Sequence, residues 1–334
     1  MSKEWTAEGV LALAREYQTA CVLAAAADLD LFRTLGSEAR TAGYLASKLG
    51  THLRGTTVLL DALVALELLD KEDGAYAVPP NLSPLLGAHD RGSVLAMIQH
   101  QANCLRRWAQ LTVVVRSGKP AVRRASIRGE EADNEAFINA MDNVSAPVAA
   151  EVIREIGPFE FTHLLDVGGA SGTWTIALLK ANPEATATLF DLPEVIPLAE
   201  RRLREAGLSR RVRLVAGDFD VDPLPEGADL AWVSAIIHQN SREQNRQLFA
   251  RVFEALAAGG RVVIRDVLMD ESRTSPPYGA MFAINMLVAT EGGGTFTYDE
   301  VREDLESAGF IDVTVLRRDE GMNSVFSAVK PVRD

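Results

Sequence analysis

The chain has 334 residues, and 47% of them are hydrophobic, so it can bury more than one core and is expected to form more than one domain. Its formal net charge of -12 excludes the general attraction that nucleic acids and anionic membranes exert on basic proteins. With two cysteines, no N-terminal signal-peptide pattern and no apolar run of about 18 residues, the sequence predicts a soluble cytoplasmic protein without disulfides.

The N-terminal part carries the pattern of a winged-helix domain, which we expect to span residues 1–100. An alanine-rich helical pattern covers residues 8–27, and two shorter patterns follow in RTAGYLASKLG and RGTTVLLDALVALELLD. Asp73-Gly74 between strand-like residues is typical of a tight β-hairpin. Three helices and a hairpin together make a winged helix.

A winged helix often binds DNA, but the charge of this one argues against that function. Residues 1–90 hold seven Lys and Arg against twelve Asp and Glu, and the expected recognition helix offers only Arg54 as a cation. A winged-helix regulator that senses a nucleoside therefore remains only an alternative. We expect the domain instead to pair with a copy of itself and form a homodimer.

Residues 101–157 are expected to form a helical connector, and the pattern changes over residues 158–334. Short apolar runs alternate there with helical segments, as THLLDV does with TWTIALLKANP. This alternation predicts an α/β fold, with a doubly wound parallel sheet and helices on both of its faces. The last two runs, IDVTVLRR and SVFSAVK, are expected to pair as an antiparallel hairpin at a sheet edge.

Polar side chains follow five of these apolar runs, at the point where each expected strand ends. They are Asp166, Asp191, Asp218, His238 and Asp266. In a doubly wound sheet the ligand binds beyond the carboxyl ends of the strands, so these side chains should converge on one site.

The loop after the first strand, DVGGASGTW, places Gly168, Gly169 and Gly172 between a strand and a helix. Glycines there let the backbone approach a ligand closely. A dinucleotide fingerprint would need further glycines where Ala170 and Thr173 stand, so binding of a pyrophosphate is disfavoured. The loop resembles motif I of class I S-adenosylmethionine-dependent methyltransferases, which surrounds the amino acid part of the cofactor.

Two further acids match a nucleoside. Asp191 ends the second strand, where its carboxylate can accept both ribose hydroxyls. Asp218 follows the third strand, where it can accept from the adenine amino group while Phe219 packs on the ring. The three strand ends together predict a nucleoside ligand with a small tail.

The motifs LLDVGGASGTW, FDLPEVI, GDF, IIHQN and GGRVVIRDVL together resemble the caffeate/flavonoid-type O-methyltransferases of plants and their bacterial relatives. This resemblance implies a class I methyltransferase domain with a Rossmann-like sheet, preceded by an all-helical winged-helix dimerisation domain. It implies S-adenosyl-L-methionine as cofactor and S-adenosyl-L-homocysteine as product. The other four histidines, His52, His89, His100 and His163, show no pair at metal-ligand spacing, so no metal is expected.

The resemblance also implies roles for single residues. His238 stands at the position of the catalytic base, and Asp266 at that of a glutamate that holds the base. Ser145 is expected to touch the cofactor, and Ser234 replaces a lysine that lies near adenine in plant members. The resemblance places five residues in the substrate pocket: Trp108, Phe137, Met141, Asn285 and Met286.

The sequence departs from the family pattern beside the base. Gln239 replaces an aspartate, Asp266 is one methylene shorter than glutamate, and Thr295 stands where a second glutamate is expected in the glycine-rich loop. We predict an O-methyltransferase of secondary metabolism that acts on a hydroxyl, preferably phenolic, of a small aromatic or polyketide-like molecule. The departures leave open a relative that binds the cofactor but catalyses decarboxylation or hydroxylation, or that methylates nitrogen or carbon.

Overall fold

The computed structural model describes residues 4–87, 92–157 and 159–332. The chain divides into two compact units, Met1–Ala109 with Val122–Asn143, and Gln110–Ala121 with Val144–Asp334. The three-part division at residues 100 and 157 stays a prediction. His89 lies outside the described residues.

The first unit is mainly helical and contains a small antiparallel sheet in the order β1-β3-β2. Asp73 and Gly74 join β2 to β3 with φ values of 49° and 76°, so the predicted hairpin is confirmed. The elements before α9 are α1 (Ala7–Leu13), α2 (Tyr17–Asp28), α3 (Leu31–Leu35), β1 (Arg40–Thr41), α4 (Ala42–Leu49), α5 (Leu53–Ala65), β2 (Asp70–Glu72), β3 (Ala75–Ala77), α6 (Ser83–Leu86) and α7 (Leu95–Trp108).

The prediction of one helix over residues 8–27 is wrong, because the backbone turns between α1 and α2. Arg15 and Glu16 donate their N–H groups to carbonyls three residues earlier instead of four. α1 buries none of its residues, so no packing against the rest of the chain holds α1 and α2 together as one continuous helix.

The second unit is built on a seven-stranded sheet in the order β11-β12-β8-β7-β4-β5-β6. The ladders from β8 to β6 are parallel, and β12 pairs antiparallel with β11, as predicted. β12 also pairs antiparallel with β8, which joins the hairpin to the parallel strands. The strands are β4 (His163–Val167), β5 (Thr186–Asp191), β6 (Val212–Ala216), β7 (Ala228–Ser234), β8 (Leu256–Asp266), β11 (Ile311–Arg317) and β12 (Ser324–Val329).

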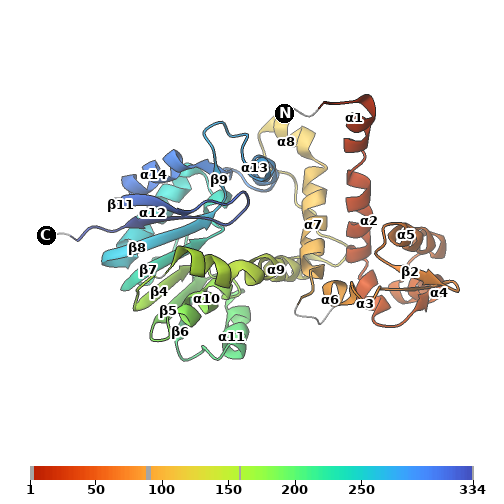
Figure 1. The fold of residues 1–334 in the computed structure, drawn as a ribbon, viewed down its shortest axis with the longest axis horizontal. Helices are drawn as coiled ribbons and strands as arrows, with labels where there is room; N and C mark the ends of the chain where they lie inside the picture. Colours follow the sequence, from red (N-terminus) through yellow and green to blue (C-terminus); the bar gives the residue numbers. More distant parts are fainter. Residues whose placement is uncertain (1–3, 88–91, 158, 333–334) are drawn as a thin grey trace. The chain divides into compact units, whose positions relative to one another are not determined.

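Helices cover both faces of this sheet (Figure 1). α10 and α11 lie on one face with the C-terminal half of α9, and α12 and α14 lie on the other. A short pair, β9 (Leu268–Met269) with β10 (Phe296–Thr297), lies outside the main sheet. The helices are α8 (Leu111–Ser117), α9 (Glu130–Ile156), α10 (Thr173–Ala181), α11 (Ile196–Glu205), α12 (Arg242–Ala255), α13 (Pro277–Ala289) and α14 (Tyr298–Ser307).

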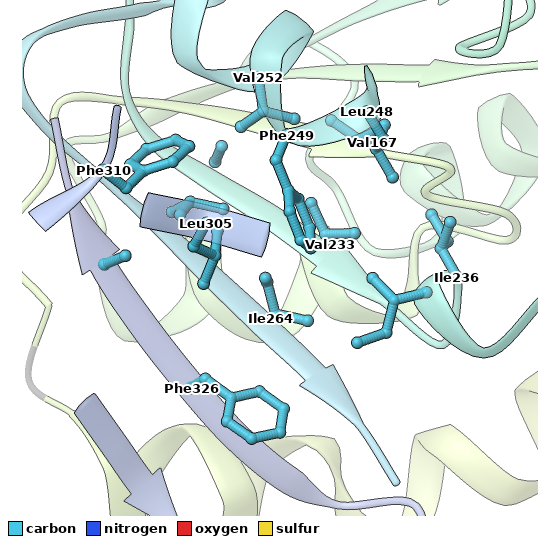
Figure 2. Packing of buried hydrophobic residues seen from close by; sticks show 14 of the residues in the cluster. Val167, Val233, Ile236, Leu248, Phe249, Val252, Ile264, Leu305, Phe310 and Phe326 are labelled. Atoms are coloured by element: carbon cyan, nitrogen blue, oxygen red, sulfur yellow. The ribbon is translucent and has the colours of Figure 1, made fainter. Parts of the chain in front are cut away.

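Successive residues of the central strands enter two different cores, which explains why these strands are almost continuously apolar. Leu165 packs under α12 and α14 while its neighbour Leu164 packs under α9 and α10. On β8, Ile264 joins the first core and Val263 the second. Figure 2 shows the first core, in which Phe249 and Leu305 reach the sheet from the two helices.

The strand order reverses at β4, so the sheet has a topological switch point at the carboxyl ends of β4 and β7. From β4 the chain runs outward through β5 to β6, and it then returns to β7 on the other side of β4. Loops leaving two neighbouring strands in opposite directions open a ligand site between them. No helix within the described ranges is long and apolar enough to cross a membrane.

Candidate active site

His238 and Asp266 meet at the carboxyl ends of the adjacent strands β7 and β8. His238 lies in a short 3-10 turn, Ile237–Gln239, and Asp266 is the last residue of β8. The Nδ1 atom of His238 is 2.8 Å and 3.0 Å from the two carboxylate oxygens of Asp266. A carboxylate only accepts hydrogen bonds, so Nδ1 carries the hydrogen and Nε2 is the basic nitrogen.

Both groups are buried, which makes their mutual orientation rigid. His238 is 7% exposed and Asp266 is 1% exposed. Asp266 also accepts the N–H of Val267 at 2.8 Å, so its carboxylate is held from two sides. Such a pair can take a proton at Nε2 while the carboxylate stabilises the resulting imidazolium.

The backbone around His238 is fixed by α12. Ser241 caps this helix, and the reciprocal bonds between Ser241 and Gln244 confirm the predicted capping box. The buried amide of Asn245 donates to the carbonyl of Ile237 at 3.0 Å and accepts from Asn240 at 3.1 Å. These asparagines were not among the predicted site residues, although the position of Asn245 on the inner face of an amphipathic helix was a signal.

Aromatic side chains of α13 border the base. The rings of Phe282 and His238 meet edge to face, with their centres 4.9 Å apart. The ring of Tyr278 stacks on that of Phe282, with the two centres 5.8 Å apart. Asn285 and Met286 lie on the same helix, and Met286 is buried. The spacing of Tyr278, Phe282 and Met286 by four residues marks one helix face, but it does not show which way that face points.

At two positions of the glycine loop after β4, a side chain would displace a neighbouring side chain. A Cβ atom at Gly168 would lie 2.5 Å from Ile236 Cδ1, and one at Gly169 would lie 2.5 Å from Leu189 Cγ. Gly172 has φ 78° and is the N-cap residue of α10. The backbone itself therefore forms this part of the site, with a helix N-terminus behind it.

Asp191 and Asp218 are held by backbone donors. Asp191 accepts the N–H groups of Ala170 and Leu192, each at 2.7 Å. Burial raises the pKa of Asp191, and these two bonds oppose that effect. Each oxygen keeps a further lone pair for a ligand hydroxyl. Asp218 accepts the N–H of Asp220 at 2.9 Å.

Phe219 borders the glycine loop. A Cβ atom at Gly168 would lie 3.5 Å from Phe219 Cε1, so the ring and the loop are neighbours. The loop, the two carboxylates and the ring have the donors, acceptors and apolar surface that an adenine nucleoside needs, so these residues fit S-adenosylmethionine.

Asp166 has surroundings different from those of the other acids. It is 1% exposed and accepts the hydroxyl of Thr175 in α10 at 2.5 Å. Burial raises its pKa to about 7. A Cβ atom at Gly169 would lie 3.0 Å from Asp166 Cγ, so this carboxyl group lies behind the loop and ties it to α10. Its direct contact with a cofactor stays a prediction.

Ser234, the last residue of β7, accepts a hydrogen bond at 3.0 Å from Arg265. Arg265 was not among the predicted site residues. Ser145 lies half-buried in α9. Gln239 is exposed, and its amide donates to the carbonyl of Ala235 at 3.0 Å. Thr295 is 5% exposed and directly precedes β10.

Three predicted pocket residues belong to the first compact unit. Trp108 ends α7, and Phe137 and Met141 lie in α9. The ring of Phe137 is 5.1 Å from that of His100 and is 43% exposed. Their place in a substrate pocket stays a prediction. Across the described residues, no group of three or more His, Cys, Asp or Glu side chains could hold a metal ion.

Comparison with known proteins identifies two family models. The O-methyltransferase domain matches residues 108–311, and the O-methyltransferase dimerisation domain matches residues 11–81. The tetracenomycin polyketide synthesis 8-O-methyl transferase TcmO of Streptomyces glaucescens is 34% identical over 310 residues, which cover 91% of each chain.

A second relative and a solved structure are similar over comparable lengths. The 3-hydroxy-5-methyl-1-naphthoate 3-O-methyltransferase of Streptomyces sahachiroi is 33% identical over 317 residues, or 92% of this chain and 91% of that protein. The crystal structure of human N-acetylserotonin methyltransferase in complex with SAM has a TM-score of 0.81 at 25% identity, covering 99% of this chain and 100% of that one.

Proposed function

We propose the chemistry of this site from the premise that the chain belongs to the O-methyltransferase family whose members carry an N-terminal dimerisation domain. The protein is a methyltransferase with a class I methyltransferase fold, and its cofactor is S-adenosylmethionine. When bound, this cofactor supplies a methyl group on a positively charged sulfur. Our proposal concerns which residues of this chain bind the cofactor and which residue removes the proton from the substrate hydroxyl.

The observation that carries the proposal is the buried pair of His238 and Asp266 beside the nucleoside-binding residues. His238 Nε2 accepts the proton of the substrate hydroxyl as the oxygen attacks. A phenol and a free imidazole differ by roughly 3.5 pKa units, so complete transfer of the proton before attack would be uphill by about 5 kcal/mol. Asp266 lowers this cost because it stabilises the imidazolium.

The cofactor residues follow from their hydrogen-bonding capacity. Asp191 holds the ribose hydroxyls, Asp218 accepts from the adenine amino group, and Phe219 packs on the adenine ring. Gly168, Gly169 and Gly172 let the loop backbone surround the amino acid part, with Ser145 and Ser234 at its border. In-line transfer depends on this alignment, which can supply roughly 7 to 11 kcal/mol of the barrier reduction.

The substrate that we propose is a flat phenol, such as a fused aromatic polyketide. Tyr278 and Phe282 present stacked rings next to the base, and such rings suit a planar ligand. The two Streptomyces relatives are named for a polyketide and a naphthoate. Asn285, Met286 and Thr295 complete this side of the pocket, with Gln239 at its entrance.

We also propose that the winged-helix domain forms the homodimer. α1 buries none of its residues, although several of them are large and apolar. Val10, Leu11 and Leu13 are each 53% exposed. Tyr17, at the start of α2, is 59% exposed. An apolar surface of this kind on a matched dimerisation domain suits a second copy of the chain.

The proposal is tested by incubating the protein with methyl-labelled S-adenosylmethionine and a panel of naphthols, other fused phenols, aromatic amines and the corresponding methyl ethers. We expect label in the phenols and none in the methyl ethers, in which the acceptor oxygen is blocked. Label in amines alone would replace the proposal with N-methylation. Cofactor binding without any labelled product, together with loss of CO₂ or uptake of oxygen, would replace it with another reaction.

A further inference from the structure

The guanidinium of Arg265 is a buried cation that the proposed chemistry leaves without a role. The side chain belongs to β8, is 2% exposed, and lies with its guanidinium 4.6 Å from the centre of the Trp174 ring. It donates to Ser234 at 3.0 Å and to the Asn323 amide oxygen at 2.9 Å. Among the described residues, no carboxylate lies within 4.0 Å of it.

The acids nearest to Arg265 are engaged elsewhere. Asp266 accepts from His238 and from the N–H of Val267. Asp319 accepts from Arg317 at 2.8 Å and from the backbone of Gly321. Burial lowers the pKa of Arg265 to about 10, so the group stays protonated at neutral pH. A buried charge without an ion-pair partner is costly, and a bound anion would offset that cost.

Arg265 lies at the edge of the sheet where the cofactor residues converge. It is the penultimate residue of β8 and pairs in register with Ser234, the last residue of β7. Trp174 lies in the first turn of α10, directly after the glycine loop. The guanidinium thus contacts Trp174, which follows the loop that is predicted to surround the amino acid part of the cofactor, and Ser234 at the end of β7.

We propose that Arg265 donates hydrogen bonds to the α-carboxylate of S-adenosylmethionine. This carboxylate is the one anionic group of the cofactor, and a guanidinium binds carboxylates through a fork of five N–H donors. The bonds to Ser234 and Asn323 use two of these donors. The inference rests on the cofactor alone, so it holds or fails independently of the proposed base and substrate.

The test is isothermal titration calorimetry with S-adenosylmethionine and with decarboxylated S-adenosylmethionine, which lacks only the carboxylate. The wild-type protein should bind the first about 10- to 100-fold more tightly than the second. Arg265→Met should lose most of this preference while keeping its affinity for the decarboxylated ligand. The proposal is overturned if the preference persists in the variant, or if both ligands lose affinity equally.

A matched control comes from the same strand. Arg261 lies four residues earlier on the same face of β8, near the middle of the strand, and donates to Ser327 at 2.9 Å. Arg261→Met should keep the wild-type preference. If it reduces the preference as much as Arg265→Met does, the effect is one of general charge and the proposed contact is wrong.

A second variant decides the matter if Arg265→Met does not fold. Ser234→Asp places a carboxylate next to the guanidinium, so the fold gains an ion pair while the cofactor carboxylate meets a competitor. The variant should remain folded and should lose the preference for the carboxylated ligand. Ser234→Asn measures the cost of the changed shape without the charge. Equal preferences in the two Ser234 variants would overturn the proposal.

Discussion

At the scale of single residues, the imidazole of His238 connects the fold to the reaction. Its Nδ1 atom is bound to Asp266, so one nitrogen is left for the substrate. His163, the first residue of β4, also bonds through its ring, to Thr186 and Thr188, but it lies at the opposite end of the parallel strands. The two histidines therefore form a matched pair for substitution.

His238→Ala should lower kcat by roughly 10² to 10⁴, the usual contribution of a general base. The dissociation constant for S-adenosylmethionine should stay within about threefold, because no cofactor contact is removed. His163→Ala should leave kcat unchanged. Steady-state kinetics with a labelled methyl group and calorimetric titration measure both quantities. Turnover that survives the loss of His238 would remove this residue from the mechanism.

Asp166 makes the stability of the protein depend on pH. Its folded-state pKa of about 7 lies above the ordinary value of 3.8 for aspartate, so the folded state binds more protons between these values. The free energy of unfolding should therefore fall as the pH rises through this range, by up to roughly 1.4 kcal/mol per pH unit from this group. The loss is complete above the folded-state pKa.

Asp166→Asn removes this titration, so urea denaturation of the cofactor-free protein at pH 5, 6, 7 and 8 should show a flatter dependence for the variant. The wild type should lose stability relative to the variant as the pH rises. Parallel curves for the two proteins would mean that Asp166 titrates normally.

At the scale of elements, the helix cap beside the base has two effects that can be separated. Ser241 caps α12 directly after the turn that carries His238, and Thr41 caps α4 in the first unit. Both hydroxyls accept a backbone N–H from the third residue after them. The two caps are chemically similar, but one of them supports the turn that holds the base.

Ser241→Ala and Thr41→Ala should each lower the free energy of unfolding by about 1 kcal/mol, the usual cost of losing an N-cap. Ser241→Ala should also lower kcat, because His238 loses support, whereas Thr41→Ala should not. Chemical denaturation and kinetics on the same samples compare the two effects. Equal kcat values in both variants would show that the base is positioned without this cap.

The elements also show how far the sequence alone could predict the site. The places of Asp191 and His238 could be predicted from the sequence, because the carboxyl ends of parallel strands all lie at one edge of the sheet. Chain order alone therefore places those side chains together. The role of Arg265 could not be predicted from the sequence, since it depends on which face of β8 the side chain occupies and on the register of β8 with β7. Phe282 was missed for a similar reason: helical spacing defines a face of α13 but not its direction.

At the scale of the whole molecule, the exposed apolar surface of α1 predicts a homodimer in which this helix contacts the second copy of the chain. Leu13→Asp places a charge on this surface and should convert a dimer into a monomer in size-exclusion chromatography with light scattering. Val221→Asp, at a residue that is 72% exposed in the second unit, should leave the dimer intact. A dimer that tolerates Leu13→Asp at the same protein concentration would exclude α1 from the interface.

The antiparallel edge of the sheet has a consequence for how this enzyme tolerates insertions and deletions. Arg265 and Asp266 are neighbours on β8 but project to opposite faces, and β12 fixes their position through the pairs Val325 with Arg265 and Ser324 with Asp266. A slip of one residue would move one of these charges to the wrong face, placing either the Asp266 carboxylate where Arg265 lies beside Trp174, or the Arg265 guanidinium where Asp266 lies beside His238. The C-terminal hairpin therefore determines which charged side chain faces which part of the active site. An insertion or deletion in β8 should abolish activity even where the protein still folds.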